Sequence, residues 1–287
     1  MTTLESILAE FPVPPEIPAT ESSGRVPALR PAPKVVLFDV YGTLVAPRLG
    51  DLEQQMKGER ERRSFVLTAR RFGFSDQAGS GWAATFYEQV ERELARCAET
   101  GIQRGEVLVE SIWRSLLLEA GADCRQLPPR VPALYREMLA NPVALFSGVK
   151  EALLSLKACG KTPGLASNAQ FYTLPVLERL LGAPPSSFFH EDWTFLSYRL
   201  GFAKPDPHFF RLVRARALGA GYEAGEVLVV GNDPVNDVRA AALHGLQAIL
   251  FHPAAPECGG SLPEASSSSF VGGFRELVQA LCGPRSP

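Results

Sequence analysis

The fold of this chain is decided by a short apolar run, Val35-Val36-Leu37-Phe38, which stops abruptly at Asp39-Val40-Tyr41-Gly42-Thr43. Such a run is typical of a strand that is buried on both faces, as in a parallel sheet. The same pattern returns three times: at 164–166 before Ser167-Asn168, at 227–230 before Gly231-Asn232-Asp233, and at 248–251 before His252-Pro253. Each run ends in polar or small residues, and we read all four as strands.

Helical patterns alternate with these runs. They cover residues 149–158, 171–181, 207–218 and 236–243, and a last one covers 274–281. Strands and helices in alternation predict right-handed βαβ units and an α/β fold with a doubly wound parallel sheet. In this architecture ligands bind outside the carboxyl ends of the strands, where the polar tails of the runs would lie.

Residues 51–141 interrupt the alternation with four amphipathic helical runs, at 63–72, 82–97, 106–120 and 130–139. A helical bundle inserted after the first strand explains this, and its position makes it a lid over the catalytic edge. The aromatic residues of the segment either line a substrate pocket or, as is commoner at helical spacing, form the core of the bundle. They are Trp82, Phe86, Tyr87, Trp113 and Tyr135.

The chain is therefore expected to have three parts. Residues 1–33 form a Pro-rich N-terminal leader, since seven prolines between 12 and 33 remove amide donors and favour extended backbone. Residues 34–47 and 142–287 form the α/β core domain, and residues 48–141 form the α-helical cap domain. Within the core, residues 252–269 are rich in Pro, Gly, Ser and Ala and predict an irregular loop.

Composition indicates a soluble globular protein. Of 287 residues, 46% are hydrophobic and 21% charged, and the formal charge is -2, so no global field favours nucleic acid or a membrane surface. No secretory signal and no stretch of ~18 apolar residues is present, which predicts a cytoplasmic protein. The cysteines are odd in number and lack CxxC pairing, so we expect reduced thiols at Cys97, Cys124, Cys159, Cys258 and Cys282. The oligomeric state stays open.

Polar residues of the types that handle an anion are expected to meet at the carboxyl edge of the sheet. Asp39 either caps its own turn or serves as a carboxylate nucleophile. An anionic small-molecule substrate facing such a nucleophile needs hydrogen-bond donors and a fixed cation, and clustered oxygens also suit Mg²⁺. The chain supplies Ser167, Asn168, Lys204, Asn232, Asp233 and Asp237 for these tasks.

This set resembles the four motifs of the haloacid dehalogenase (HAD) superfamily of hydrolases. The motifs appear in the expected order as Phe38-Asp39-Val40-Tyr41-Gly42-Thr43-Leu44, Ser167-Asn168, Lys204-Pro205 and Gly231-Asn232-Asp233-Pro234-Val235-Asn236-Asp237, and the resemblance spans roughly residues 34–251. It implies a Rossmann-like core with an inserted α-helical cap.

The resemblance also implies a role for each residue. Asp39 would be the covalent nucleophile, and Lys204 would neutralise the charge of the nucleophile and the substrate. Asp39, Asn232 or Asp233, and Asp237, directly or through water, would contact Mg²⁺. Asp237 alone also suits the start of a helix. Thr43, Ser167 and Asn168 would hold the transferring group or Asp39.

Two positions depart from the pattern. HAD phosphatases usually carry a second aspartate two residues after the nucleophile, and Tyr41 stands there, so we place Tyr41 in both the catalytic and the metal-contacting sets. A phenol is a poor general base at neutral pH, which costs roughly 10²–10⁴-fold in rate. The second departure is Asn232, at a position that phosphatases usually fill with a metal-binding aspartate.

Three functions remain open. The first is a Mg²⁺-dependent phosphatase acting on a small phosphate ester. The second is a metal-independent 2-haloacid dehalogenase, whose halide leaving group needs no proton and whose halide would be held by a cap arginine such as Arg48, Arg70 or Arg71. The third is a HAD-fold binding or regulatory protein with weakened catalysis. Gln170 and Tyr172 follow the second motif and either touch substrate or begin a helix.

Overall fold

A computed structural model describes residues 2–18, 26, 29–47, 57–253 and 270–283. The chain divides into two compact units. The helical unit contains Met1–Pro14, Pro47–Val143 and Gln170–Leu180, and the sheet unit contains Pro15–Ala46, Ala144–Ala169 and Leu181–Pro287. In the described ranges, every helix is too short or too polar to cross a bilayer.

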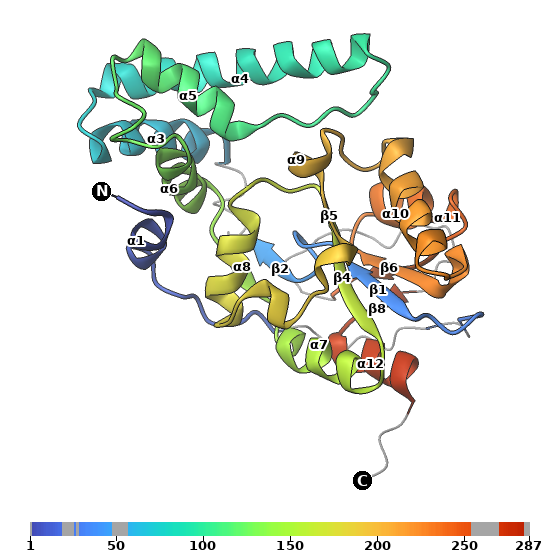
Figure 1. Cartoon of the computed structure of the whole chain (residues 1–287). Helices are drawn as coiled ribbons and strands as arrows, with labels where there is room; N and C mark the ends of the chain where they lie inside the picture. Colours follow the sequence, from blue (N-terminus) through green and yellow to red (C-terminus); the bar gives the residue numbers. More distant parts are fainter. Residues whose placement is uncertain (1, 19–25, 27–28, 48–56, 254–269, 284–287) are drawn as a thin grey trace. The chain divides into compact units, whose positions relative to one another are not determined.

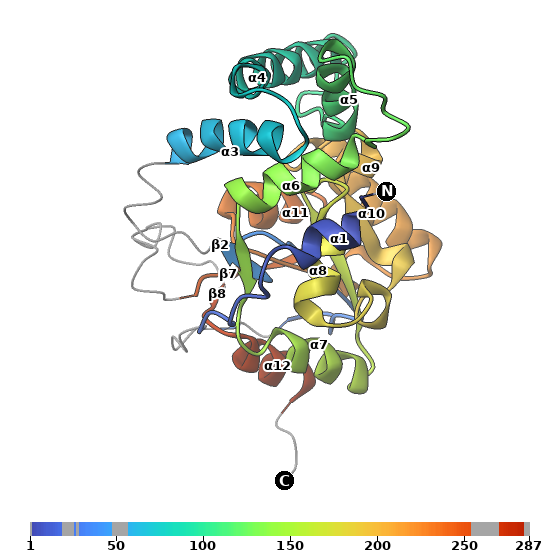
Figure 2. The ribbon, with the colours of Figure 1, turned by 90° about the vertical axis from the view of Figure 1, so that its left-hand side faces the viewer.

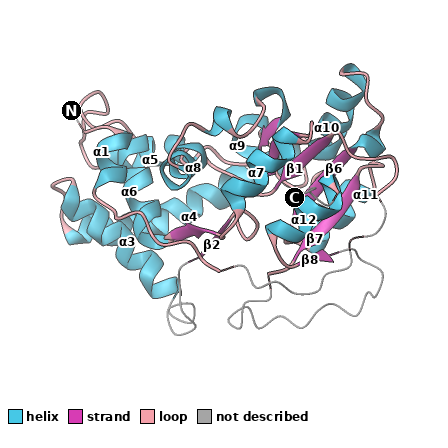
Figure 3. Ribbon diagram, turned by 90° about the horizontal axis from the view of Figure 1, so that it is seen from below, coloured by secondary structure: helices cyan, strands magenta, loops and turns pink. Residues whose placement is uncertain are grey.

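The sheet unit is built on six parallel strands in the order β5-β4-β1-β6-β7-β8. Strands β1, β6, β7 and β8 are labelled beside the magenta arrows of Figure 3. The α/β fold and the four predicted strands are confirmed. Two short strands, β5 and β8, were not predicted. The strands are β1 (Val35–Phe38), β4 (Thr162–Ser167), β5 (Thr194–Leu196), β6 (Val227–Gly231), β7 (Gln247–Phe251) and β8 (Phe270–Val271).

Helices cover both faces of this sheet (Figure 1). On one face, Val35 and Leu37 belong to a buried cluster with Phe209 and Phe210 of α10 (Pro207–Gly219). On the other face, the ring of Phe38 lies 6.5 Å from that of Phe274, the first residue of α12 (Phe274–Cys282). Helix α12 lies beside α7 (Val149–Ala158), so the sheet is doubly wound.

The chain reverses its direction of travel across the sheet at β1. From β1 it proceeds to β4 and β5 on one side, and it returns to β6, β7 and β8 on the other. In open α/β sheets the crevice at such a switch point is where ligands bind. The ends of β1, β4 and β6 therefore mark the place where functional side chains are expected.

Short elements complete the sheet unit. Strand β2 (Val45–Pro47) pairs with β3 (Val143–Leu145) in a separate two-stranded sheet. Where a regular helix was predicted over 236–243, the chain instead forms a π-helical segment, η4, followed by one α-turn, α11. The remaining elements are η1 (Pro185–Ser187), η2 (Glu191–Trp193), α9 (Ser197–Leu200), η3 (Ala224–Glu226), η4 (Pro234–Arg239) and α11 (Ala240–Ala242).

The helical unit contains the four predicted bundle helices and two others. The ring of Phe65 lies at its core, 5.7 Å from the ring of Trp113, on which it stacks, and 5.3 Å from the tilted ring of Phe86. Trp82, Phe86 and Trp113 are buried, as bundle-core residues should be, whereas Tyr87 is partly exposed. The helices are α1 (Leu4–Ala9), α3 (Lys57–Arg71), α4 (Asp76–Glu99), α5 (Val109–Glu119), α6 (Arg130–Ala140) and α8 (Thr173–Leu181).

Helix α1 lies within residues 1–33, the segment predicted to be a Pro-rich N-terminal leader. Thr3 caps the helix, and Ile7 and Leu8 are buried. It packs beside α6 (Figure 2), where the ring of Phe11 lies 5.5 Å from that of Tyr135. The N-terminal segment up to Phe11 is therefore part of the packed helical unit.

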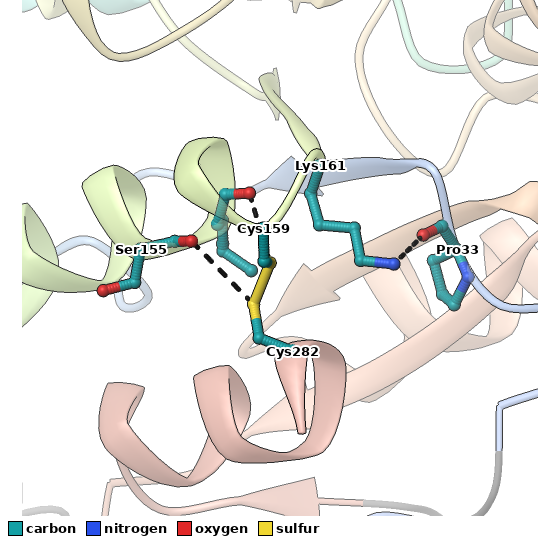
Figure 4. The surroundings of a disulfide bond; sticks show 6 residues. Pro33, Ser155, Cys159, Lys161 and Cys282 are labelled. Atoms are coloured by element: carbon teal, nitrogen blue, oxygen red, sulfur yellow. Dashed lines mark hydrogen bonds between the residues drawn. A yellow bond between two sulfur atoms is a disulfide. The ribbon is translucent and has the colours of Figure 1, made fainter. Parts of the chain in front are cut away.

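A disulfide joins the last turns of two neighbouring helices of the sheet unit. Cys159 follows α7 and Cys282 ends α12, and the two are bonded across 123 residues of sequence (Figure 4). The prediction of reduced thiols is wrong for this pair, because the packing of α12 on α7 brings together cysteines that are far apart in the sequence. It is confirmed for Cys97 and Cys124, and Cys258 lies outside the described residues.

Candidate active site

A buried ammonium group lies at the centre of the site, at the carboxyl edge of the sheet unit. The Nζ of Lys204 donates to Oδ1 of Asp39 over 2.8 Å, to the carbonyl oxygen of Ala166 over 2.7 Å, and to Oδ1 of Asp237. All three donors of the ammonium are used. The two carboxylates come from residues that follow β1 and β6, so one lysine unites two of the strand ends.

The electrostatics of this triad follow from its burial. Burial alone would lower the pKa of the Lys204 ammonium, but Asp39 and Asp237 outweigh it and hold that pKa above its ordinary value. Burial raises the pKa of the Asp237 carboxyl to about 6, although the charge of Lys204 acts in the opposite direction. With two carboxylates and one ammonium ionised, the site carries excess negative charge.

The backbone of Lys204 is held by the end of β4. The side-chain amide of Asn168 accepts from the Lys204 backbone N–H over 2.7 Å and donates to the Lys204 carbonyl over 3.0 Å. Asn168 therefore positions Lys204 directly, and it does not position Asp39 directly. Ser167 is fully buried, and among the described residues its hydroxyl donates a hydrogen bond only to the Asn168 carbonyl, over 3.5 Å.

Asp237 is held by a close approach of its own loop. Its Oδ2 accepts from the backbone N–H of Asp233 over 3.0 Å. A Cβ at Gly231 would overlap the Asp237 carboxylate, so only glycine fits there. This local bonding accounts for the π-helical turn over 234–239, because the Asp237 side chain folds back on the segment that begins the turn.

The fourth motif separates its two predicted metal contacts. The carboxylate of Asp233 accepts from the N–H groups of Val235 and Asn236, both over 2.8 Å, and from the Asn236 side-chain amide over 2.7 Å. It is thus occupied as a helix cap. The side chain of Asn232, by contrast, is exposed and lies against Gly42, where a Cβ would overlap it. Gly42 has a φ of +87°, which glycine adopts at little cost.

Two hydroxyl-bearing residues of the first motif lie outside the triad. Thr43 is fully buried, and its Oγ1 has no hydrogen-bond partner among the residues that the structure describes. Tyr41 is half-buried, and its backbone bridges to Val45. The Thr43 hydroxyl does not bond to Asp39 in the described part of the chain, so the predicted set is brought together only in part.

The donor chemistry of this edge suits a hard cation. Asp39, Asp237 and Asn232 offer two carboxylates and one amide oxygen, the ligand type that Mg²⁺ prefers. Across the described residues, however, no group of three or more His, Cys, Asp or Glu could hold a metal. The set fits a cation that keeps some of its waters rather than one enclosed by protein ligands.

The arginines considered for halide binding are engaged elsewhere. Arg70 pairs with Asp76, and Arg71 pairs with Glu10 of the N-terminal segment, both within the helical unit. Arg48 lies outside the described residues. Ser197 was not among the predicted site residues. Its hydroxyl bonds both backbone groups of Ala169, and no local sequence pattern indicates a contact between residues 28 positions apart.

These features define a buried carboxylate–lysine–carboxylate site at the switch point of an α/β sheet. A family model described as haloacid dehalogenase-like hydrolase matches residues 33–245. The chain therefore belongs to the haloacid dehalogenase-like hydrolase family, as its motifs predicted.

Several known proteins resemble the chain. It is 32% identical over 174 residues to a phosphoserine phosphatase of Thermus thermophilus, and the match covers 60% of this chain and 64% of that protein. The structure of an HAD phosphatase from Thermococcus onnurineus matches with a TM-score of 0.50 at 19% identity, over 88% of this chain and all of that one. A 2-haloacid dehalogenase from Pseudomonas syringae matches with a TM-score of 0.55 at 21% identity, over 87% and 98%. The two structural likenesses establish the fold.

Proposed function

We propose that the chain hydrolyses a small phosphate monoester through a covalent intermediate on Asp39, with Mg²⁺ as cofactor. The observation that carries this proposal is the buried Lys204 ammonium, which binds both Asp39 and Asp237 at the switch point of the sheet. The similarity to a phosphoserine phosphatase supports a phosphate ester as the substrate class. The chain spans about 64% of that relative's length, so the particular ester is left to experiment.

The reaction proceeds in two displacements. The free oxygen of Asp39, Oδ2, attacks phosphorus, and the bond from phosphorus to the alcohol oxygen breaks with its electron pair on the alkoxide. Water then attacks the aspartyl phosphate, which releases inorganic phosphate and restores Asp39. Lys204 holds Oδ1 throughout and keeps the nucleophile oriented.

Proton transfer is the weak part of this site. The family's second aspartate would protonate the leaving alkoxide, and Tyr41 stands in its place. Loss of a general acid or base typically costs 10²–10⁴-fold, roughly. We therefore expect fast turnover only for esters whose alcohol leaves without a proton.

The remaining residues bind the substrate and the metal. Asp39, Asp237 and Asn232 would hold Mg²⁺, which when bound supplies positive charge to the phosphoryl oxygens. The buried, unpartnered hydroxyl of Thr43 is available to donate to a phosphoryl oxygen or to Asp39. Asp233 is assigned to the helix cap rather than to the metal, because its carboxylate accepts three hydrogen bonds.

The first test is release of p-nitrophenol from p-nitrophenyl phosphate, with Mg²⁺ and with EDTA. We expect Mg²⁺-dependent turnover that the Asp39→Asn variant lacks. Asp192→Asn is the matched control, because this aspartate is exposed in the same unit. Turnover retained by Asp39→Asn would remove Asp39 from the reaction.

Tyr41 favours one second candidate, a 2-haloacid dehalogenase. A halide leaves carbon without a proton, so the missing acid is no handicap in that reaction. Halide release from 2-chloropropionate in the presence of EDTA, together with no phosphatase activity, would select this function. Absence of both activities with retained phosphate binding would select a binding protein.

A further inference from the structure

The end of strand β5 lies beside the loop that leaves β4. The two strands pair in parallel, and Leu196 of β5 is the register partner of Ser167 of β4. One residue further along the chain, the side chain of Ser197 reaches the loop residue Ala169. These four residues belong to the sheet unit, and Ser197 is fully buried there.

The Ser197 hydroxyl holds the peptide group that joins Asn168 to Ala169. Its Oγ accepts from the N–H of this peptide over 2.8 Å, and it donates to the Ala169 carbonyl over 3.1 Å. The carbonyl of the same peptide belongs to Asn168 and accepts from the Ser167 hydroxyl over 3.5 Å. A peptide group is planar, so bonds at its N–H and at its carbonyl fix the direction of the bond to the Asn168 Cα.

The side chain on that Cα binds the backbone of Lys204. The Asn168 amide accepts from the Lys204 N–H over 2.7 Å and donates to the Lys204 carbonyl over 3.0 Å. At the other end of the lysine, the ammonium bonds to Asp39 and Asp237. A continuous series of hydrogen bonds and one peptide group therefore runs from Ser197 to both carboxylates, all within the sheet unit.

We propose that Ser197 is a positioning residue, which fixes the Asn168 amide and through it the backbone of Lys204. Asn168 is exposed, so water competes for its amide and the packing of neighbouring side chains does not hold it in place. Its orientation depends on the buried hydroxyl groups of Ser197 and Ser167 behind it. Misplacement of a catalytic group by about 1 Å costs on the order of 100-fold in rate.

The kinetic test of this inference rests on the proposed phosphatase function. Ser197→Ala removes the hydroxyl that holds the peptide. We expect kcat for p-nitrophenyl phosphate to fall about tenfold, and KM to stay within about twofold because the charge of Lys204 remains at the site. Thr194→Val is the matched control, since Thr194 begins the same strand and its hydroxyl bonds the His190 carbonyl instead. We expect kcat and KM of this control to equal those of the wild type.

A double-variant cycle tests whether Ser197 acts through Asn168. Asn168→Ala removes the bonds to the Lys204 backbone directly. In that background, Ser197→Ala should change kcat by less than about twofold, because the route from Ser197 to Lys204 is already broken. Effects of the two substitutions that multiply in the double variant, or an unchanged kcat in Ser197→Ala, would overturn the proposal.

Amide hydrogen exchange, followed by NMR, tests the positioning without any activity. The readout is the N–H of Lys204, which donates to Asn168. The reference is the N–H of Thr162, which donates to the residue before β1 over 2.9 Å at the other end of β4. In Ser197→Ala we expect exchange at Lys204 to accelerate at least about tenfold relative to Thr162, and in Thr194→Val we expect no relative change. Equal acceleration at the two amides would indicate a general loss of stability and overturn the proposal.

The proposed function and the positioning role fail separately. A protein that is inactive on all phosphate esters and still shows the expected exchange pattern would refute the proposed function alone. An exchange rate at Lys204 that Ser197→Ala leaves unchanged relative to Thr162 would refute the positioning role alone.

Discussion

Replacing Lys204 by methionine tests whether the buried ammonium holds the site together. Methionine fills a similar volume but leaves the carboxylates of Asp39 and Asp237 buried without a cation. Removal of one partner from a buried ion pair typically costs about 3–5 kcal/mol. Asp39, Lys204 and Asp237 are only 6%, 4% and 1% exposed, so the variant would leave its carboxylates buried. We therefore expect the free energy of unfolding to fall by an amount in this range at pH 8.

The cost should depend on pH in a direction that the site determines. In the wild type, the charge of Lys204 lowers the pKa of Asp237, which burial has raised to about 6. Loss of Lys204 therefore raises that pKa further above its unfolded value. A carboxyl with a raised folded pKa contributes stability below its unfolded pKa, and the contribution is lost as pH rises through the folded pKa.

On acidification from pH 8, Asp237 of the variant therefore takes up its proton at a higher pH than Asp237 of the wild type does. The difference in stability between the two proteins should shrink on acidification, by up to about 1.4 kcal/mol per pH unit. Urea unfolding in EDTA at pH 8 and pH 6, followed by circular dichroism, measures this difference. Lys157→Met is the control, since Lys157 is exposed in the same unit and its Nζ bonds only the Ser187 carbonyl within the part of the chain that the structure describes. An equal loss at both pH values, or a loss below about 1 kcal/mol, would refute the reasoning.

Three further outcomes follow from the structure. Reduction of the disulfide between α7 and α12 opens a loop of 123 residues. By chain entropy, the free energy of unfolding of the reduced protein should be about 5 kcal/mol lower than that of the oxidised protein. Urea titrations with and without a phosphine reductant measure this difference. Protons compete with Mg²⁺ for Asp237, so calorimetric Mg²⁺ affinity should fall below pH 6, by up to about tenfold per pH unit. Gly42→Ala would displace Asn232 and should weaken Mg²⁺ binding. Gly182 has a similar positive φ with open space around it. Gly182→Ala should therefore cost the same backbone strain of about 1–2 kcal/mol and leave Mg²⁺ binding unchanged.

The long apolar patterns predicted most of the sheet, and the short elements escaped prediction for a physical reason. Strand β1 was predicted with the observed bounds, because four consecutive buried residues end at a polar turn. Strands β5 and β8 have three and two residues, too few for periodicity to register. Helix α1 has only six residues, and its capping residue Thr3 was the one local signal for it.

The candidate site was predictable in its membership but not in its bonding. The motif spacing identified Asp39, Lys204 and Asp237, and the structure joins these three. Spacing alone did not reveal that Asp233 turns its carboxylate to cap a helix while Asn232 stays exposed. That choice depends on the backbone of 233–237, where the Asp237 side chain bonds back to the Asp233 N–H.

The cysteines illustrate the limit of reading compartment from composition. Cys159 and Cys282 are brought together by the packing of α7 against α12, which no spacing rule encodes. A disulfide of this kind is more typical of an oxidising compartment than of the cytosol. The cytoplasmic location therefore stays a prediction, and cell fractionation of the native protein is its test.

The two departures from the family pattern both reduce the number of carboxylates at the site. Tyr41 and Asn232 each stand where HAD phosphatases usually carry a carboxylate, so Asp39 and Asp237 alone supply the negative charge. Fewer carboxylates bind Mg²⁺ less tightly, and they also repel an anionic substrate less. Because Lys204 already offsets one of the two charges, a bound Mg²⁺ would have less charge to neutralise before a phosphate ester could approach Asp39. The missing carboxylates would therefore reduce metal affinity and acid catalysis together. For this reason the dependence of the rate on the leaving group and on Mg²⁺ has to be measured with the same substrates.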